Sequence, residues 1–169
     1  MTEGIYLLLG SNLADKKANL TSARKEIDLR LMKESPTSVL RQSTIYETAA
    51  WGKTDQPSFY NQVIEVRTNL SPELLLHELL TIEERIGRVR KEKWGARIID
   101  IDILYYHQTI LSSVTLQLPH PGIPERRFTL VPLVELAPRF IHPVLNKTQL
   151  TLLDECNDPL DVTEAEVKI

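Results

Sequence analysis

The stretch "VLRQSTIYETAAWGKTDQPSFYNQVIEVR" (residues 39–67) decides the fold class, because it holds two extended segments with no helix between them. Residues 39–48 are rich in Thr, Ser, Val and Ile, and a strand-like run resumes at Phe59. Between them lies a loop of about ten residues (49–58), which contains Gly, Pro and Asp and is longer than an ordinary connection. Consecutive strands without a crossover helix favour an antiparallel sheet.

The neighbouring segments add a strand and a helix before this stretch and a helix after it. Residues 5–9 form an apolar run that predicts a buried strand, and apolar residues at helical spacing predict a helix over 20–31. Downstream, Ser71 followed by Pro72 predicts a helix start, and Gly87 predicts its left-handed end.

A further strand is predicted over residues 98–106, so the order is strand, helix, two strands, helix, strand. Weaker patterns follow: a hairpin within 105–115, a short helix starting near Pro132, and an acidic tail beyond Asn146. This order predicts an α+β fold, a ferredoxin-like antiparallel sheet flanked by helices, rather than a doubly wound sheet. We expect residues 1–169 to form a single domain.

The composition is that of an ordinary globular protein. Of the 169 residues 42% are hydrophobic and 25% charged, and a formal net charge of −3 predicts no general affinity for nucleic acid or anionic membranes. Cys156 is the only cysteine, which excludes an internal disulfide and a cysteine-rich metal site. We see no signal-peptide pattern and no apolar stretch near the ~20 residues that span a bilayer, so we expect a cytoplasmic protein.

Two aspartates lie in the run "WGARIIDIDIL" (94–104). Asp100 and Asp102 share one face of the predicted strand, and apolar residues on both faces predict a central strand that is covered on both sides. Two carboxylates there repel each other and are costly to bury unless they are paired or bind a metal. Such oxygen ligands suit Mg²⁺, which takes waters and substrate phosphates as its other ligands. An alternative is a structural network in which arginines neutralise the pair.

Basic residues surround this pair in the chain. Five precede it and two follow in a later loop: Arg88, Arg90, Lys91, Lys93, Arg97, His120 and Arg126. Cations beside a carboxylate pair are what a triphosphate with Mg²⁺ requires, although residues 88–93 alone are also compatible with a solvated loop. No Walker-type loop is present, which excludes a P-loop nucleotide triphosphatase.

Phe59 and Asn61 fall on one face of the strand that follows the long loop. An aromatic ring and a bifunctional amide can hold a flat heterocycle by stacking and paired hydrogen bonds. Core packing is the alternative for Phe59.

Together these features resemble the 6-hydroxymethyl-7,8-dihydropterin pyrophosphokinase family of folate biosynthesis, over about residues 4–140. The resemblance rests on "LGSN" (9–12), "YET" (46–48), "DQPSFYNQV" (55–63), "RIGRVRKEKWGARIIDIDIL" (85–104), "LPHPGIPERRF" (118–128) and "LVPLVELAP" (130–138). It implies transfer of pyrophosphate from ATP to the pterin's hydroxymethyl oxygen, with release of AMP. ATP and the pterin are then the partners, and we expect a monomer.

Residue roles follow from the same resemblance. It implies that Asp100 and Asp102 bind two Mg²⁺ ions and act in catalysis with Arg88 and Arg97. ATP contacts are implied for Gln56, Glu83, Arg88, Arg90, Trp94, Arg97, Ile103, His120 and Arg126. Pterin contacts are implied for Thr48, Ala49, Trp51, Phe59, Asn61 and Phe128.

The chain departs from the family pattern near two of these motifs. Ala49 and Ala50 follow Thr48 where a proline is frequent, Trp51 replaces an aliphatic residue, and Lys93 replaces an arginine. These changes put substrate affinity in doubt rather than the reaction, because a lysine makes no bidentate contact and the metal pair is untouched.

Two other functional classes remain open from the sequence. One is a different Mg²⁺-dependent phosphoryl or nucleotidyl transferase, which would keep the aspartates and arginines without a pocket formed by Phe59, Asn61 and Phe128. The other is a non-enzymatic module that binds a small ligand or RNA.

Overall fold

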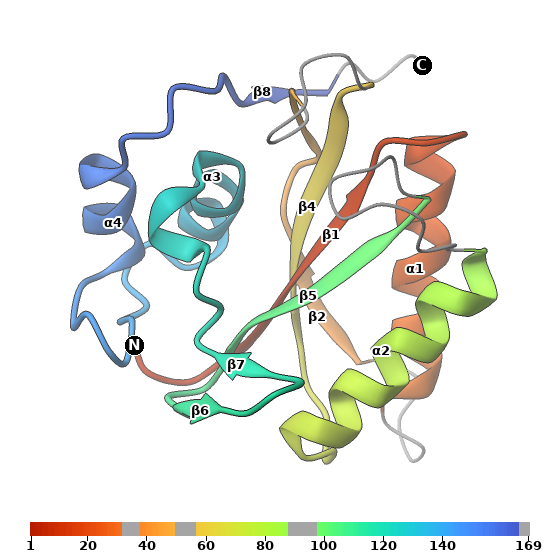
Figure 1. The fold of residues 1–169 in the computed structure, drawn as a ribbon, viewed down its shortest axis with the longest axis horizontal. Helices are drawn as coiled ribbons and strands as arrows, with labels where there is room; N and C mark the ends of the chain where they lie inside the picture. The colour runs from red at the N-terminus through yellow and green to blue at the C-terminus, as the bar shows by residue number, and fades with distance from the viewer. Residues whose placement is uncertain (32–37, 50–56, 88–97, 166–169) are drawn as a thin grey trace.

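The computed structural model describes residues 1–31, 38–49, 57–87 and 98–165. The strands of its main sheet are β1 (Ile5–Ser11), β2 (Val39–Gln42), β3 (Tyr46–Thr48), β4 (Phe59–Val66), β5 (Asp100–Tyr106) and β8 (Thr163–Glu164). They pair antiparallel in the order β5-β1-β4-β3-β8, and β2 also pairs with β4 (Figure 1). The short strands β6 (Leu111–Ser112) and β7 (Gln117–Leu118) form a separate hairpin.

Helices cover both faces of the sheet. The helices α1 (Lys16–Arg30) and α2 (Pro72–Ile86) lie on one side, and α3 (Arg127–Leu136) and α4 (Gln149–Glu155) lie on the other (Figure 1). Leu7 and Leu9 of β1 belong to the core cluster under α1 and α2, whereas Tyr6 and Leu8 belong to the cluster under α3 and α4. The predicted α+β fold with an antiparallel sheet flanked by helices is confirmed.

Both helices predicted in the first half are confirmed, and for α2 the predicted start at Ser71 and left-handed end at Gly87 are confirmed as well. Asp15 caps α1 by accepting a hydrogen bond from the Ala18 amide, and Ser71 caps α2 by accepting one from the Leu74 amide. At the other end of α2, Gly87 has φ of 112°, a left-handed conformation that glycine adopts without strain.

The segment predicted as one strand over 39–48 forms two strands, β2 and β3, which both pair with β4. Ser43 lies at the break. Its amide donates to the Val63 carbonyl at 2.8 Å, and its hydroxyl accepts from the Val63 amide at 3.0 Å. Because a side-chain oxygen takes the place of a backbone acceptor, the regular ladder stops there.

The strand that carries the two aspartates lies at an edge of the sheet, so the prediction of a central strand is wrong. Among the residues that the structure describes, β5 pairs only with β1. Its apolar side chains are buried because both faces are covered, which does not require a second neighbouring strand. A register shift between Tyr6 and Leu7 also places Leu104 and Tyr105 in the same cluster, where regular alternation separates them.

The second half of the chain also differs from the prediction. The hairpin spans Leu111 to Leu118, later than predicted, because a turn at His107, with φ of 53°, separates it from β5. The helix α3 begins at Arg127 and contains Pro132, so the predicted start near Pro132 is wrong. The Asp158 carboxylate accepts a hydrogen bond from the Arg127 amide at 3.0 Å and so caps this helix from the C-terminal tail.

The tail beyond Asn146 is part of the fold. It forms α4, capped by Thr148, and then β8, which pairs with β3 through Tyr46 and Glu164 (Figure 1). None of the helices in the described ranges has the length and apolar character that a bilayer crossing needs.

Candidate active site

Gly10 joins the two halves of the predicted site. It pairs with Asp100 of β5 on one side and with Asn61 of β4 on the other. Paired residues of neighbouring strands project from the same face, so the carboxylates and the predicted heterocycle-binding residues share one surface. A Cβ atom at Gly10 would lie 3.0 Å from Asn61 Oδ1 and 3.6 Å from Phe59 Cδ1. The absence of a side chain there leaves this surface open between the two halves.

The two aspartates are partly exposed rather than enclosed by the core. Asp102 pairs with Leu8, two residues before Gly10 on β1, and its side chain is 33% exposed. Asp100 and Asp102 are among the residues that line a cavity of about 450 Å³ between the edge of β5 and α2, together with Leu76, Leu80, Glu83, Glu84, Ile101 and Thr115. The two aspartates are therefore less buried than predicted, so burial alone does not require a metal, and an open cavity lies beside them.

The donor set fits Mg²⁺ held jointly with a substrate. No group of three His, Cys, Asp or Glu side chains suited to a metal occurs within the described ranges. A site with two carboxylates therefore depends on waters or phosphate oxygens for its remaining ligands, which is the usual mode of Mg²⁺ binding in phosphoryl-transfer enzymes.

Glu83, predicted to contact ATP, ties α2 to the beginning of β5. Its side chain is 2% exposed, and Oε2 accepts a hydrogen bond from the Ile101 amide at 2.7 Å. This bond holds the backbone beside Asp100. Ile103, also predicted to contact ATP, is 3% exposed and packs in the cluster under α1 and α2, so its side chain faces away from the aspartates.

His120, predicted to contact ATP, lies beside Asp102. Its Nε2 is 4.0 Å from Asp102 Oδ2, while its Nδ1 accepts a hydrogen bond from the Gly122 amide at 3.0 Å. Burial is the main cause that lowers the pKa of His120 to about 4, and the charge of Arg126 adds to it, whereas Asp100 opposes it. The imidazole is thus neutral near pH 7, and because Nδ1 accepts, Nε2 carries the proton and is a donor on the carboxylate side.

The predicted heterocycle-binding residues come together at the ends of β3 and β4. Thr48 pairs with Phe59, and Asn61 Nδ2 donates to Thr48 Oγ1 at 3.0 Å. Thr48 and Asn61 are both 3% exposed, whereas Phe59 is half-buried and Ala49 is exposed. This hydrogen bond fixes the amide with its oxygen toward Gly10.

Phe128 and Arg126 lie at the beginning of α3, on the same side of the sheet. Phe128 is half-buried and packs against the cluster under α3 and α4, and the Arg126 guanidinium carbon is 5.8 Å from its ring centroid. Glu135 anchors this helix to β3, because it accepts hydrogen bonds from the Thr44 amide and the Tyr46 hydroxyl.

Several predicted site residues lie outside the described ranges: Gln56, Trp51, Arg88, Arg90, Trp94 and Arg97, together with Ala50, Lys91 and Lys93. The predicted roles of these residues stay predictions, as does the alternative in which their guanidinium groups neutralise the aspartates.

Three structural contributors to the site were not predicted. Gly10 belongs to "LGSN", which reads as a turn but continues β1 through Ser11. Asp158 and Lys16 act through contacts distant in sequence, to α3 and to the beginning of β4. Only the unusual "GSN" ending of an apolar run signalled any of them in the sequence.

A family model and individual relatives match the chain. The model for 7,8-dihydro-6-hydroxymethylpterin-pyrophosphokinase matches residues 6–138. The 2-amino-4-hydroxy-6-hydroxymethyldihydropteridine pyrophosphokinase of Methylorubrum extorquens is 43% identical over 136 residues, 80% of this chain and 84% of the relative. That of Aquifex aeolicus is 38% identical over 143 residues, 85% of this chain and 86% of the relative.

Longer proteins contain a similar segment. The folic acid synthesis protein fol1 of Pneumocystis carinii is 40% identical over 142 residues, but the match spans only 18% of that protein. Among solved structures, a Plasmodium falciparum HPPK-DHPS triple mutant superposes with a TM-score of 0.70 at 16% identity, over 92% of this chain and 43% of that one. At that identity the structural likeness shows the fold alone. The sequence matches show that the chain belongs to the 7,8-dihydro-6-hydroxymethylpterin-pyrophosphokinase family.

Proposed function

We propose that this chain transfers the pyrophosphoryl group of ATP to the hydroxymethyl oxygen of 6-hydroxymethyl-7,8-dihydropterin and releases AMP, with Asp100 and Asp102 holding two Mg²⁺ ions. Pyrophosphoryl transfer to this pterin, in folate biosynthesis, is the reaction of the family to which the chain belongs. The observation that carries the residue assignment is the pairing of Gly10 with Asp100 and Asn61, which joins the carboxylates and the amide on one open surface.

The pterin half of this surface supports recognition of a flat heterocycle. Phe59 and Phe128 contribute aromatic faces, and Asn61, oriented by Thr48, contributes an amide that both donates and accepts. The other Asn61 N–H and the amide oxygen would read the edge of the ring, beside the backbone near Ala49.

The other half of this surface, which holds Asp100, Asp102, His120 and Arg126, supports binding of a triphosphate together with Mg²⁺. Bound Mg²⁺ would supply positive charge that neutralises phosphate oxygens and lowers the pKa of the attacking hydroxyl. Neutral His120 would donate from Nε2 to a phosphate oxygen, and Arg126 would contribute a second, charged donor. Arg88 and Arg97 are proposed to bind the triphosphate during transfer, on the family resemblance.

Catalysis in this arrangement would consist mainly of positioning and electrostatic stabilisation. Glu83 holds the backbone beside the carboxylates through the Ile101 amide, and Gly10 keeps the path between the two half-sites free of side chains. The hydroxymethyl oxygen can then attack the β-phosphorus in line, with AMP as the leaving group.

A product assay tests the reaction. We expect AMP to form from ATP only when 6-hydroxymethyl-7,8-dihydropterin and Mg²⁺ are both present. Formation of ADP or of free pyrophosphate would instead support another phosphoryl or nucleotidyl transferase. Release of AMP without the pterin would contradict the acceptor assignment.

Asparagine substitutions test the metal-binding role. We expect Asp100→Asn and Asp102→Asn each to lower kcat by at least about a hundredfold, because a neutral amide attracts Mg²⁺ far less than a carboxylate. Asp154→Asn changes an exposed aspartate on α4 and is the matched control. Unchanged turnover in both site variants, with folding intact, would contradict the proposal and favour a non-catalytic binding module.

We further propose that the protein acts as a monomer in the cytoplasm. Sedimentation velocity with and without both substrates tests the first statement, and a single species of one chain's mass is expected.

A further inference from the structure

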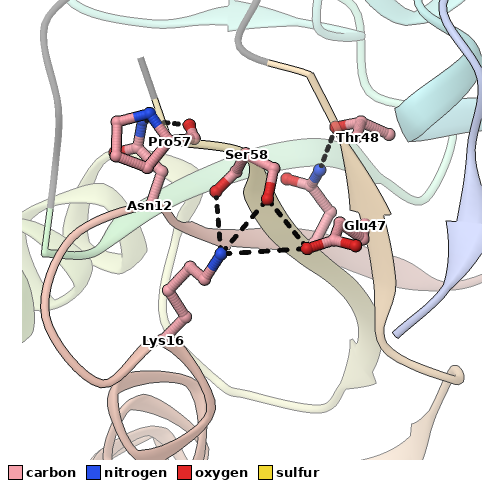
Figure 2. A network of polar contacts seen from close by, with 7 residues as sticks. Asn12, Lys16, Glu47, Thr48, Pro57 and Ser58 are labelled. Atoms are coloured by element: carbon pink, nitrogen blue, oxygen red, sulfur yellow. Dashed lines mark hydrogen bonds and ion pairs between the residues drawn. The ribbon is translucent and has the colours of Figure 1, made fainter. Parts of the chain in front are cut away.

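Lys16 forms the centre of a polar cluster on the side of the β3–β4 pair that faces α1. Its Nζ donates to the Ser58 carbonyl and to the Ser58 hydroxyl, each at 3.2 Å, and lies 3.9 Å from Glu47 Oε2 (Figure 2). Ser58 Oγ in turn donates to Glu47 Oε2 at 2.8 Å. The ammonium group therefore makes two hydrogen bonds to Ser58 and a longer ion pair to Glu47.

The partners of Lys16 are the chain neighbours of two proposed pterin contacts. Glu47 directly precedes Thr48, and Ser58 directly precedes Phe59; Thr48 and Phe59 are themselves paired across the two strands. Lys16 thus links a side chain of β3 to the backbone just before β4, where the two strands form one end of the proposed pocket.

Lys16 acts from the opposite face of these strands. Glu47 pairs with Tyr60, and the Lys16 ammonium lies 4.3 Å from the Tyr60 ring centroid, so all three occupy one face. Side chains alternate along a strand, which puts Thr48 and Phe59 on the other face. Any effect of Lys16 on the pterin must therefore pass through the backbone.

Within the described ranges, the end of this strand pair is also held by the Asn61–Thr48 hydrogen bond and by the pairing of Glu47 with Thr163 of β8. The strand β3 has only three residues, and Phe59 is the first residue of β4. The Asn12 side chain adds one further tie, because its Nδ2 donates to the Pro57 carbonyl at 3.2 Å (Figure 2). Strand ends with few backbone hydrogen bonds separate readily unless side chains secure them.

We propose that Lys16 is a positioning residue for the pterin pocket. By joining Glu47 and Ser58 it sets the spacing between Thr48 and Phe59, and hence the affinity for the pterin but not for ATP. The inference rests on the proposed function, since it needs the pterin at this end of the strands. Because the Glu47 side chain is 42% exposed, the ion pair adds little to global stability, and loss of binding is separable from loss of folding.

The test compares Lys16→Met, which removes the ammonium but keeps an unbranched side chain, with Lys16→Arg, which restores charge and donors. Lys17→Met changes the exposed neighbour on α1 and is the matched control. We expect Lys16→Met to raise the dissociation constant and KM for 6-hydroxymethyl-7,8-dihydropterin by about tenfold, with the constants for ATP within about twofold of the parent. Lys16→Arg should recover most of the affinity, and Lys17→Met should match the parent.

Glu47→Gln provides a second variant that removes the shared charge. If the two side chains act as one unit, the double variant Lys16→Met/Glu47→Gln should weaken pterin binding no more than Lys16→Met alone. Additive losses, or equal weakening of ATP and pterin binding, would overturn the inference. So would unchanged pterin binding in Lys16→Met while the parent binds normally. Failure of the parent chain itself to bind the pterin would overturn the proposed function as well, which distinguishes the two results.

Discussion

At the scale of single residues, the site depends on a position without a side chain. Gly10 lies between Asp100 and Asn61 on the middle strand of the three, and its carbonyl and amide continue the ladder like those of any residue. Glycine is favoured there by the close approach of Asn61 Oδ1 rather than by an unusual backbone angle. This makes a single methyl group a sensitive probe of the site.

We expect Gly10→Ala to weaken pterin binding by about tenfold, because its Cβ would lie 3.0 Å from Asn61 Oδ1 and force the amide to move. Titration calorimetry with the pterin measures the effect. The unfolding free energy should change by less than about 1 kcal/mol, because the lower flexibility of alanine in the unfolded chain offsets the displaced amide. The substitution should have little further effect in an Asn61→Ala background; a full effect there would show that it does not act through Asn61.

At the scale of secondary-structure elements, α3 brings Phe128 and Arg126 to the sheet, and its beginning is held by the C-terminal tail. The N-cap residue Arg126 makes no side-chain cap; Asp158 caps the helix instead, because its Oδ2 accepts from the Arg127 amide. Its Oδ1 accepts from the Leu160 amide within the tail. Asp158 is 5% exposed, so the bond is protected from water. The tail thereby determines where an aromatic and a cationic residue of the site lie.

We expect Asp158→Ala to lower the unfolding free energy by about 1–2 kcal/mol, because the first amide of α3, that of Arg127, loses its acceptor. It should also weaken pterin binding, because Phe128 is in the first turn of that helix. Asp161→Ala, which changes an exposed aspartate of the same tail, is the control. Urea denaturation and pterin titration measure the unfolding free energy and the pterin affinity of both variants. Equal values for the two variants would refute the capping role.

The order of elements was predictable because it depends on local patterns. The N-cap at Ser71, the left-handed Gly87 and the apolar spacing of α1 act over a few residues, and all were confirmed. The start of α3 was not, because its cap is 31 residues away in sequence. The break at Ser43 escaped prediction for the same reason, since it depends on a bond to Val63.

At the scale of the whole molecule, buried histidines make stability depend on pH. His142 is 4% exposed, its Nδ1 accepts from the Val144 and Leu145 amides, and burial lowers its pKa below the ordinary value. The pKa of His120 is likewise lowered, to about 4. In the unfolded chain both titrate near 6.5, so the unfolded state binds protons first as the pH falls.

We therefore expect the unfolding free energy to be fully developed above about pH 6.5 and to fall as the pH drops from there toward 4. Denaturation curves between pH 7.5 and 5, without nucleotide or Mg²⁺, measure this slope. His142→Asn keeps an acceptor for the turn but removes one titrating group, so its slope should be shallower than that of the parent. An identical slope in the two proteins would exclude a contribution from His142.

The sequence by itself determined the fold class, the two helices of the first half, the aspartate pair and the aromatic–amide pair, because each follows from periodicity and residue chemistry within a short window. Only the tertiary structure decided that β5 is an edge strand, that its carboxylates are partly exposed, and that Gly10 brings them beside Asn61. Strand order and long-range caps depend on which segments meet in space, and a linear pattern does not contain that information. The contacts of Asp158 and Lys16 belong to this second kind, because each joins segments that only folding brings together.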